Sequence, residues 1–460
     1  MLKRIKIYYL FTLLCVSTIS CKKDFLEVKP DQQLLVPSSL SDLAAILNHT
    51  DMNFSTGMHI IATDDYQIFA ESTLATFGST TARNAYLWKK DLYENSTFMP
   101  DWDKAYQQVF YANVVLDALE KIERGMDNAS SYDNIKGYAL FFRAVAFYQL
   151  AVSFTSTYTK DTNTDQLGIP LKLSADVNEK LVRSSLQETY NTIISDLKAA
   201  KALIQKAIET QPVNPSKLAV DAILARVFLS IGDYENALIH AGECIASKGV
   251  LMDYNNFSRT SNRPISFNEA SNTEVIYWQW MHSYPFASGS ATSVSTDIVN
   301  SYHASDLRKY IFLRDRGNGV FTFKGNYTGD SYVFTGPATD EMYLIRAECS
   351  ARLGNIDLAM KDLAFLLKHR WDNTKPLPVI SATDRDQALA MILENRRKEL
   401  VTRGSRWSDL RRLNLDSRYA VELKRVLSGI VYTLPPNDPR YVFPIPTSEV
   451  KRHGFQQNER

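Results

Sequence analysis

Cysteine is scarce in this chain, and its few copies do not form a disulfide pattern. Only four occur in 460 residues. Cys15 lies within an N-terminal apolar run and Cys21 directly follows it, whereas Cys244 and Cys349 fall in apolar helical patterns. A free cysteine in such a pattern behaves as a small hydrophobic residue. We therefore predict a fold without a disulfide framework, although the N-terminus indicates export.

An excess of charge of either sign is also missing. The chain has 52 Lys and Arg against 51 Asp and Glu, which gives a formal net charge of +1. This balance excludes the broad basic surface of a nucleic-acid-binding protein. One stretch, Glu394–Arg412, alternates in sign. On helices such alternation indicates structural ion pairs and a solvated face rather than an anion site.

Sequence motifs of catalysis and metal binding are absent as well. The seven histidines have no metal-ligand spacing, and the chain has no G-x-S-x-G elbow and no phosphate-binding glycine loop. Asp161–Asp165 begins like a calcium loop, but Gln166 replaces the turn glycine and Lys172 replaces the bidentate glutamate. We therefore expect no metal centre, no cofactor and no catalytic residues. A carboxylate pair that only the fold assembles would escape these patterns, so a hydrolase stays open as an alternative.

One mostly apolar run, Ile7–Ile19, follows basic residues at positions 3, 4 and 6. Its length of about 13 residues suits the core of a signal peptide better than a membrane span. Ser20 and Cys21 then resemble a bacterial lipobox, although Thr18 stands where leucine is commonest. We predict a lipoprotein signal peptide over residues 1–20 and acylation of Cys21, for example by palmitate. An ordinary signal peptide or an uncleaved signal anchor is the alternative.

Helical periodicity dominates the chain after residue 100. Leu218–Ile245 predicts two antiparallel helices joined at Gly232-Asp233, and Met342–Leu367 repeats the design with Gly354-Asn355 at its turn. Each pair resembles a tetratricopeptide (TPR) hairpin, which must stack on neighbours to bury its apolar face. Further helices are predicted at 41–47, 101–124, 132–154, 185–211 and 391–400, and the one at 132–154 is apolar on both sides, which is typical of the interior of a stack.

Two long segments, 49–99 and 255–335, lack this periodicity and predict loops with short elements. Within the second, Glu274–Trp280 predicts a strand, and Tyr310–Lys324 predicts a β-hairpin with Gly317-Asn318-Gly319 at its tip. The predicted fold is mostly α, with about four TPR-like helix pairs packed against an irregular, loop-rich half that carries short β-hairpins. We expect residues 21–460 to form one domain.

A set of short segments is spread in order over nearly the whole chain after residue 20. No single segment is decisive, but together they resemble the SusD/RagB family of lipid-anchored nutrient-binding proteins of the bacterial outer surface. The segments are Cys21–Leu26, Trp102–Tyr106 with Asn113, Phe142–Ala144, Gly168–Pro170, Ser216–Ala219, Tyr343–Glu348, Asn395–Leu400, Arg406–Arg411 and Phe443–Pro446.

The resemblance implies a SusD-like fold in which helix pairs cradle a ligand-binding half. It also implies a partner, a TonB-dependent (SusC-like) outer-membrane transporter that the lipoprotein covers like a lid. The expected function is to bind a nutrient such as an oligosaccharide at the cell exterior and to deliver it to that transporter. Family members also bind peptides or other nutrients, so these ligands stay open. An envelope interaction scaffold that binds no small ligand is the alternative from another class.

Sugar binding needs aromatic faces that stack on pyranose rings, with polar groups that orient the hydroxyls. In the family, the ligand surface is built from loops in broadly the two regions given above. The candidate ligand-binding residues there are Tyr86, Trp88, Trp278, Trp280, Tyr284 and Phe286. The alternative is that Trp278 and Trp280, which share one face of the predicted strand with Ile276, are core residues. Trp102 is assigned to helix packing.

Overall fold

The helix pair α10–α11 forms where the sequence predicts it. Helix α10 spans Lys217–Ser230 and α11 spans Tyr234–Lys248. The Ser216 side chain accepts a hydrogen bond from the Ala219 N–H, and the Asp233 side chain accepts one from the Asn236 N–H. Gly232 has a φ of +74°, the left-handed conformation that ends a helix. Local capping therefore determines both ends of the turn.

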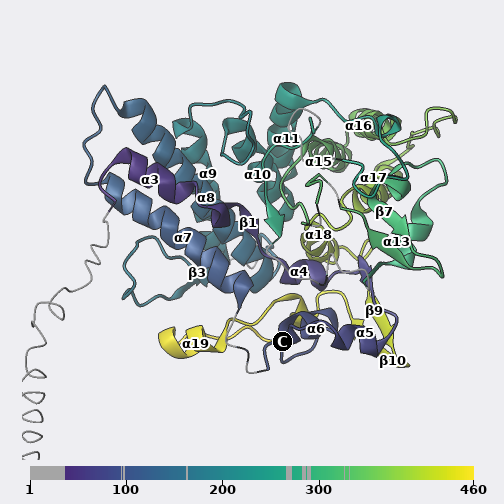
Figure 1. Ribbon diagram of the computed structural model, residues 1–460, viewed down its shortest axis with the longest axis horizontal. Coiled ribbons are helices and arrows are strands. Elements are labelled where there is room, and N and C mark those ends of the chain that lie inside the picture. The colour runs from purple at the N-terminus through teal and green to yellow at the C-terminus, as the bar shows by residue number, and fades with distance from the viewer. Residues whose placement is uncertain are drawn as a thin grey trace, which may run out of the picture. The chain divides into compact units, whose positions relative to one another are not determined.

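Figure 1 shows this pair within a computed structural model of the chain. The structure describes residues 37–94, 96, 99–161, 164–265, 272–281, 286, 292–325, 327–330 and 332–460. The predicted signal peptide, the lipobox and Cys21 lie outside these residues. Residues 40–460 form one compact unit.

A second pair of the same design consists of α15 (Thr339–Arg352) and α16 (Ile356–Lys368). Gly354 has a φ of +89°, and the Asn355 side chain accepts a hydrogen bond from the Leu358 N–H. Helix α15 packs on α11, so the two pairs are neighbours in one stack although the loop-rich segment separates them in the sequence (Figure 1).

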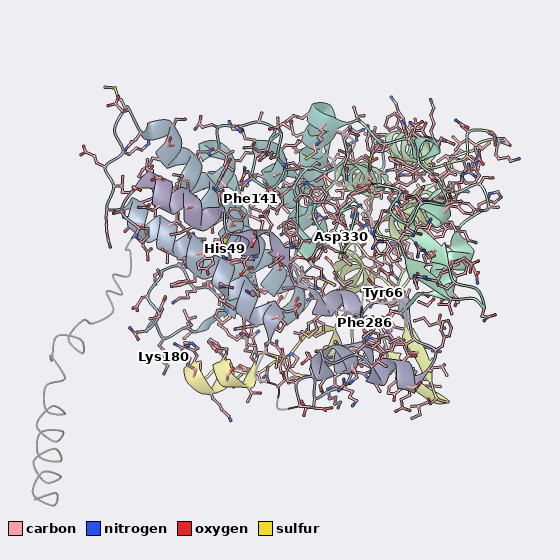
Figure 2. All side chains as sticks on the ribbon, in the orientation of Figure 1. His49, Tyr66, Phe141, Lys180, Phe286 and Asp330 are labelled. Atoms are coloured by element: carbon pink, nitrogen blue, oxygen red, sulfur yellow. The ribbon has the colours of Figure 1, made fainter. Side chains whose placement is uncertain are left out.

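The other half of the stack is built around a long apolar helix. Helix α8 (Ala129–Phe154) lies between α7 (Pro100–Leu119) and α9 (Leu186–Leu203). Its length and composition would suffice for a membrane span, but most of it is buried inside the protein. Figure 2 marks Phe141, one of its fully buried side chains. The predicted interior position of this helix is confirmed.

The remaining helices complete the mostly helical fold that the sequence predicts. Helix α3 packs on α7 and α8, and α17 packs on α15 and α16. Trp102 on α7 is buried against Tyr106 and Phe154, which confirms its packing role. The bounds are Leu40–Leu47 for α3, Arg385–Glu399 for α17, Arg406–Leu413 for α18 and Thr447–His453 for α19.

The first loop-rich segment pairs with the second through short strands. Strand β1 (Phe54–Ser55) runs parallel to β5 (Trp280–Met281), and β2 (Tyr66–Gln67) runs antiparallel to β6 (Ser293–Val294). The other elements of these segments are η1 (Thr50–Asn53), α4 (Met58–Ile61), α5 (Glu71–Ala75), α6 (Thr80–Tyr86), η2 (Tyr254–Asn256), α13 (Thr296–Ser301) and α14 (Arg308–Phe312). These pairings bring the two segments to one side of the helix stack.

The predicted strand at 274–280 is mostly wrong. Only its last residue is in a strand, because the backbone of this segment divides its hydrogen bonds among several partners. The Ile276 and Tyr277 N–H groups donate to Pro337 O, whereas the Trp278 N–H donates to Pro212 O. The predicted hairpin is confirmed as β7 (Leu313–Asp315) and β8 (Phe321–Phe323).

A C-terminal β-hairpin that the sequence reading missed lies beside α5 and α6 (Figure 1). Strand β9 (Leu423–Leu427) pairs with β10 (Ile430–Leu434) across a tip at Ser428-Gly429. Alternate residues of β9 are buried, so Arg425 points inward with Leu423 and Leu427. The other short elements are β3 (Leu167–Pro170), β4 (Arg183–Ser185) and η3 (Pro439–Tyr441).

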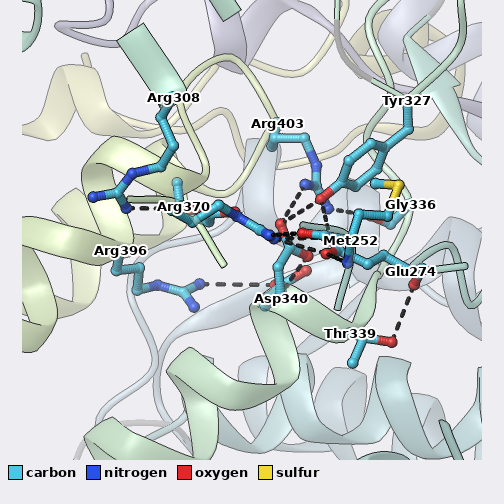
Figure 3. Close-up of polar contacts among 12 residues, drawn as sticks. Met252, Glu274, Arg308, Tyr327, Gly336, Thr339, Asp340, Arg370, Arg396 and Arg403 are labelled. Carbon is cyan, nitrogen blue, oxygen red and sulfur yellow. Dashed lines mark hydrogen bonds and ion pairs between the residues drawn. The ribbon is translucent and has the colours of Figure 1, made fainter. Parts of the chain in front are cut away.

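Buried ion pairs join the second loop-rich segment to the helix stack (Figure 3). Arg370 Nη2 donates to the Glu274 carboxylate at 2.8 and 3.0 Å, and Arg370 Nε donates to Glu399 at 2.7 Å. Asp340 accepts hydrogen bonds from Arg403 and Tyr327, both at 2.9 Å. The network therefore holds this segment against α15 and α17.

The Glu394–Arg412 stretch supplies part of this network, which confirms its predicted structural role. Its predicted solvated face is wrong, however, because Arg396, Glu399, Arg403 and Arg411 are all buried. The alternating charges pair across elements, as in the 2.8 Å contact between Arg396 and Asp409. Cys244 and Cys349 are buried and free, as predicted, and burial raises the pKa of the Cys244 thiol.

Candidate functional site

A cavity of about 420 Å³ opens where four separate parts of the chain meet. Residues of both loop-rich segments line it, together with the β9–β10 hairpin and α17. The lining residues are Asp64, Tyr66, Gln67, Ile68, Tyr86, Trp88, Ser295, Thr296, Asp297, Arg397, Val421, Glu422, Leu423, Lys424, Arg425 and Val426. Its size falls in the range of small-molecule sites.

Two predicted ligand-binding residues, Tyr86 and Trp88, lie in the wall of this cavity. The Tyr86 hydroxyl accepts a hydrogen bond from the Ile68 N–H at 2.8 Å, and Trp88 Nε1 donates to Ala62 O at 2.8 Å. Trp88 has a φ of +51°, which is rare for a bulky residue. Such backbone outliers cluster at functional sites, where the surroundings hold them in place.

The Arg425 guanidinium lies over both of these rings. Its central carbon is 3.5 Å from the Tyr86 ring centroid and 4.4 Å from the Trp88 ring centroid. Arg425 Nη2 donates to the carbonyl oxygens of residues 61, 62 and 63. Burial lowers the pKa of Arg425 to about 10, while Tyr86 and Asp64 act in the opposite direction. The site therefore contains a desolvated cation stacked on two aromatic rings.

A second layer of aromatic side chains supports the wall. The Phe286 ring packs on Tyr86 at 5.3 Å, on Tyr66 at 5.8 Å and on Phe77 at 4.6 Å between ring centroids. Figure 2 marks Tyr66 and Phe286 close together. Phe286 is itself buried and is not among the lining residues. Phe286, a predicted ligand-binding residue, therefore supports the cavity wall by packing on Tyr86 and does not itself face the cavity.

Two neighbouring acids at the cavity differ strongly in their pKa values. Asp64 pairs with Arg397 at 2.8 Å and with Arg406 at 2.8 Å, and these arginines hold its pKa well below the usual range in spite of burial. Burial, aided by the charge of Asp64, raises the pKa of Asp65 to about 6. At about pH 5 the pair therefore carries less negative charge than two ordinary carboxylates.

Polar groups surround the mouth of the cavity. Gln67 Oε1 accepts hydrogen bonds from the N–H and the hydroxyl of Thr296, at 3.3 and 3.2 Å. Lys424 pairs with Glu422 at 3.0 Å, and both side chains are exposed. Asp297, in the first turn of α13, is also exposed. An aromatic wall with a polar mouth can bind a ligand that has both apolar faces and hydroxyl groups.

Two predicted ligand-binding residues, Trp278 and Trp280, do not line this cavity. Trp278 is 1% exposed and packs edge-to-face on Phe334 at 5.1 Å, in the core of the second loop-rich segment. Trp280 on β5 is half-buried and meets Phe54 edge-on at 5.7 Å. Tyr284 lies outside the described residues.

Other lining residues are not predicted from the sequence. Arg425 lies on a hairpin that was not predicted, although Ser428-Gly429 between two alternating runs is a turn signal that could have located it. Arg397 belongs to the Glu394–Arg412 stretch, for which the sequence predicts a solvated face, and no pattern singles out Tyr66. Their positions depend on pairings between distant segments, which a sequence pattern does not contain.

Comparison with known proteins relates both ends of the chain to one family. A sequence profile described as starch-binding and associating with the outer membrane matches residues 24–229, and the SusD family profile matches residues 339–459. The SusD-like protein P38 of Formosa agariphila is 23% identical over 413 residues, which cover 73% of this chain and 76% of that protein.

Solved structures have the same fold. A SusD superfamily protein of Bacteroides thetaiotaomicron matches with a TM-score of 0.73 at 20% identity, covering 92% of this chain and 100% of that one. A SusD-like carbohydrate binding protein of Bacteroides vulgatus matches with a TM-score of 0.66 at 19% identity, covering 91% and 97%. At these identities the likeness establishes the fold.

Proposed function

This chain belongs to the SusD/RagB family, and we propose that it binds a carbohydrate in the cavity lined by Tyr86 and Trp88. The family consists of outer-membrane-associated binding proteins rather than enzymes. The starch-binding description of one matching profile and the carbohydrate binding of a structural neighbour support a sugar as the ligand.

The observation that carries the proposal is the composition of the cavity wall. Both loop-rich segments contribute to it, which is what the family resemblance implies for the ligand surface. Trp88 and Tyr86 form the aromatic part of the wall with the Arg425 guanidinium over their rings, and Gln67, Thr296 and Asp297 supply donors and acceptors at the mouth. A pyranose ring has the matching chemistry, with apolar faces and an equator of hydroxyl groups.

We further propose that the protein is anchored through acylated Cys21 and hands its ligand to a TonB-dependent transporter in the outer membrane. The lipobox-like Ser20-Cys21 supports the anchor, and the family supports an outer-membrane location. A cavity that binds its ligand through non-covalent contacts suits transfer, because a carrier must release what it binds.

Calorimetric titration of the mature protein with an oligosaccharide identified on a glycan array tests the carbohydrate site. We expect Trp88→Ala to weaken binding at least tenfold, or about 1.4 kcal/mol. Because Trp88 is buried, Gln67→Ala at the mouth serves as a second variant that leaves the wall intact. Tyr332→Ala, at an exposed residue outside the cavity, is the matched control. Equal binding by all three variants would contradict the assigned site, and binding of peptides but no glycan would contradict the ligand class.

A further inference from the structure

We propose that the carbohydrate bound in this cavity carries an anionic group, a carboxylate or a sulfate ester, and that Arg425 selects for it. The proposal rests on the function proposed above and narrows its ligand class. Neutral glycans such as starch should then bind more weakly than glycans that contain uronic acids or sulfated sugars.

Arg425 differs from most buried arginines of the described residues. It is 6% exposed, yet no carboxylate in the described part of the chain pairs with it. The other buried arginines pair with an acid, as Arg308 does with Asp306 and Arg403 does with Asp340. The exception is Arg411, whose two terminal nitrogens both donate to carbonyl oxygens and which does not line the cavity.

The hydrogen-bonding capacity of Arg425 is only partly used. Nη2 donates to three carbonyl oxygens, whereas Nε and Nη1 have no hydrogen-bond partner among the described residues. A guanidinium has five N–H donors and no acceptor, so its remaining N–H groups can be satisfied only by hydrogen-bond acceptors. An unpaired buried charge is costly, and stacking on Tyr86 and Trp88 offsets only part of that cost. The site thus retains a cation without its counter-ion, at the wall of a cavity.

The acids that line the cavity do not supply that counter-ion. Asp64 is shared between Arg397 and Arg406, and Glu422 pairs with Lys424 at the mouth. Asp297 is exposed on α13, where water and salt screen its charge. Asp65, buried behind Asp64, accepts a hydrogen bond from the Thr402 N–H at 3.3 Å and does not line the cavity.

A second cation lies in the same cavity. Arg397 lines the wall from α17, its side chain is 27% exposed, and its carboxylate partner Asp64 also serves Arg406. A ligand anion in the cavity would therefore lie close to two guanidinium groups. Carboxylate and sulfate oxygens are acceptors only, and charge-assisted hydrogen bonds from arginine are about twice as strong as neutral ones. The hydroxyl of a neutral sugar lacks the charge to match Arg425.

Titration of the mature protein with three oligosaccharides of equal length tests the proposal. The probes are a neutral β-glucan oligomer, an oligogalacturonate that carries carboxylates and a carrageenan oligomer that carries sulfates. We expect at least one acidic probe to bind ten times more tightly than the neutral one at low salt, with the advantage shrinking as salt is raised. Whichever acidic probe binds better identifies the source of the anion.

Variants then test the role of Arg425 itself. Arg425→Met, which keeps much of the side-chain length, should bring the ratio of acidic to neutral affinity down to about one, whereas Arg425→Lys should keep part of the preference. Arg418→Met, at an exposed arginine outside the cavity, is the control and should keep the full ratio. The melting temperature of each variant identifies a folding defect; if Arg425→Met does not fold, the ratio in Arg425→Lys and the salt dependence of the unaltered protein decide.

Each contrary outcome has a distinct meaning. Binding of the neutral probe as tightly as the acidic ones overturns the anion preference and leaves the proposed carbohydrate function standing. A parallel loss of neutral and acidic binding in Arg425→Met also overturns it, because Arg425 would then only hold the two rings in place. Failure of all glycans to bind the unaltered protein overturns the proposed function.

Discussion

Burial decides the chemistry of single side chains in this protein. His59 on α4 is buried, with one ring nitrogen 3.2 Å from the Thr56 hydroxyl and the other 3.2 Å from Gly404 O. Burial lowers its pKa from 6.5 to about 4, although Asp101 acts in the opposite direction. The folded protein therefore holds a neutral imidazole at pH values where the unfolded chain would already be protonated.

This shift predicts a loss of stability on mild acidification. A folded-state pKa below the unfolded one contributes stability that is complete above pH 6.5 and is lost as the pH falls toward 4. The contribution amounts to about 2 kcal/mol between pH 8 and pH 5. Urea unfolding of the natural protein and of His59→Gln gives the free energy of unfolding of each at several pH values over this range. The contribution of His59 is the change with pH in the difference between the two free energies. Parallel profiles would contradict a neutral buried histidine.

At the scale of elements, the helix pairs depend on a left-handed residue at each turn. Gly232 and Gly354 occupy equivalent turns with φ values of +74° and +89°. A Cβ at Gly354 would meet no atom within 4 Å, so the requirement there is conformational and not steric. Ser185 and Glu188 form a capping box at the start of α9, which is a second case of local control.

Alanine substitutions at two glycines separate these effects. Gly354→Ala should destabilise the protein by about 1–2 kcal/mol, because an L-residue pays for the left-handed conformation. Gly242→Ala is the matched control: its Cβ also meets nothing within 4 Å, but it lies inside α11 and should stabilise by about 0.5–1 kcal/mol. Chemical denaturation measures both changes. Equal effects would mean that the turn conformation does not limit stability.

At the scale of the whole molecule, a helix stack supports a set of loops that carry the cavity. The strand pairs β1–β5 and β2–β6 and the buried Glu274–Arg370 pair fasten the two loop-rich segments to each other and to the stack. The proposed anchor would tether this assembly at the membrane surface, so that the cavity acts close to a transporter.

Metabolic labelling with palmitate tests the anchor. We expect label in the natural protein and in Cys15→Ala, and none in Cys21→Ala, which should also leave the membrane fraction. Cys15 is the matched control, because it lies six residues upstream within the predicted signal peptide. Label retained by Cys21→Ala would mean that the lipid is attached elsewhere.

The sequence by itself determined the elements whose causes are local. Apolar periodicity located α7 to α11 and α15 to α17, and glycine, serine and asparagine signals located the turns of the two helix pairs, because capping and left-handed turns involve neighbouring residues. Two predicted ends are wrong: α9 stops at Leu203 instead of residue 211, and α17 begins at Arg385 instead of Met391. The same reasoning assigned Cys244 and Cys349 to the core and Trp102 to helix packing.

Only the tertiary structure decided what lines the cavity. Tyr86 and Trp88 contact the β9–β10 hairpin there, although most of the chain separates them in the sequence. Trp278, an aromatic residue of the other loop-rich segment, instead packs in the core. The charges of Glu394–Arg412 were also placed by long-range partners, as with Arg396 and Asp409. Composition indicates which side chains could stack or pair. Whether each one is buried or exposed depends on contacts with distant segments, and those contacts form only when the whole fold packs.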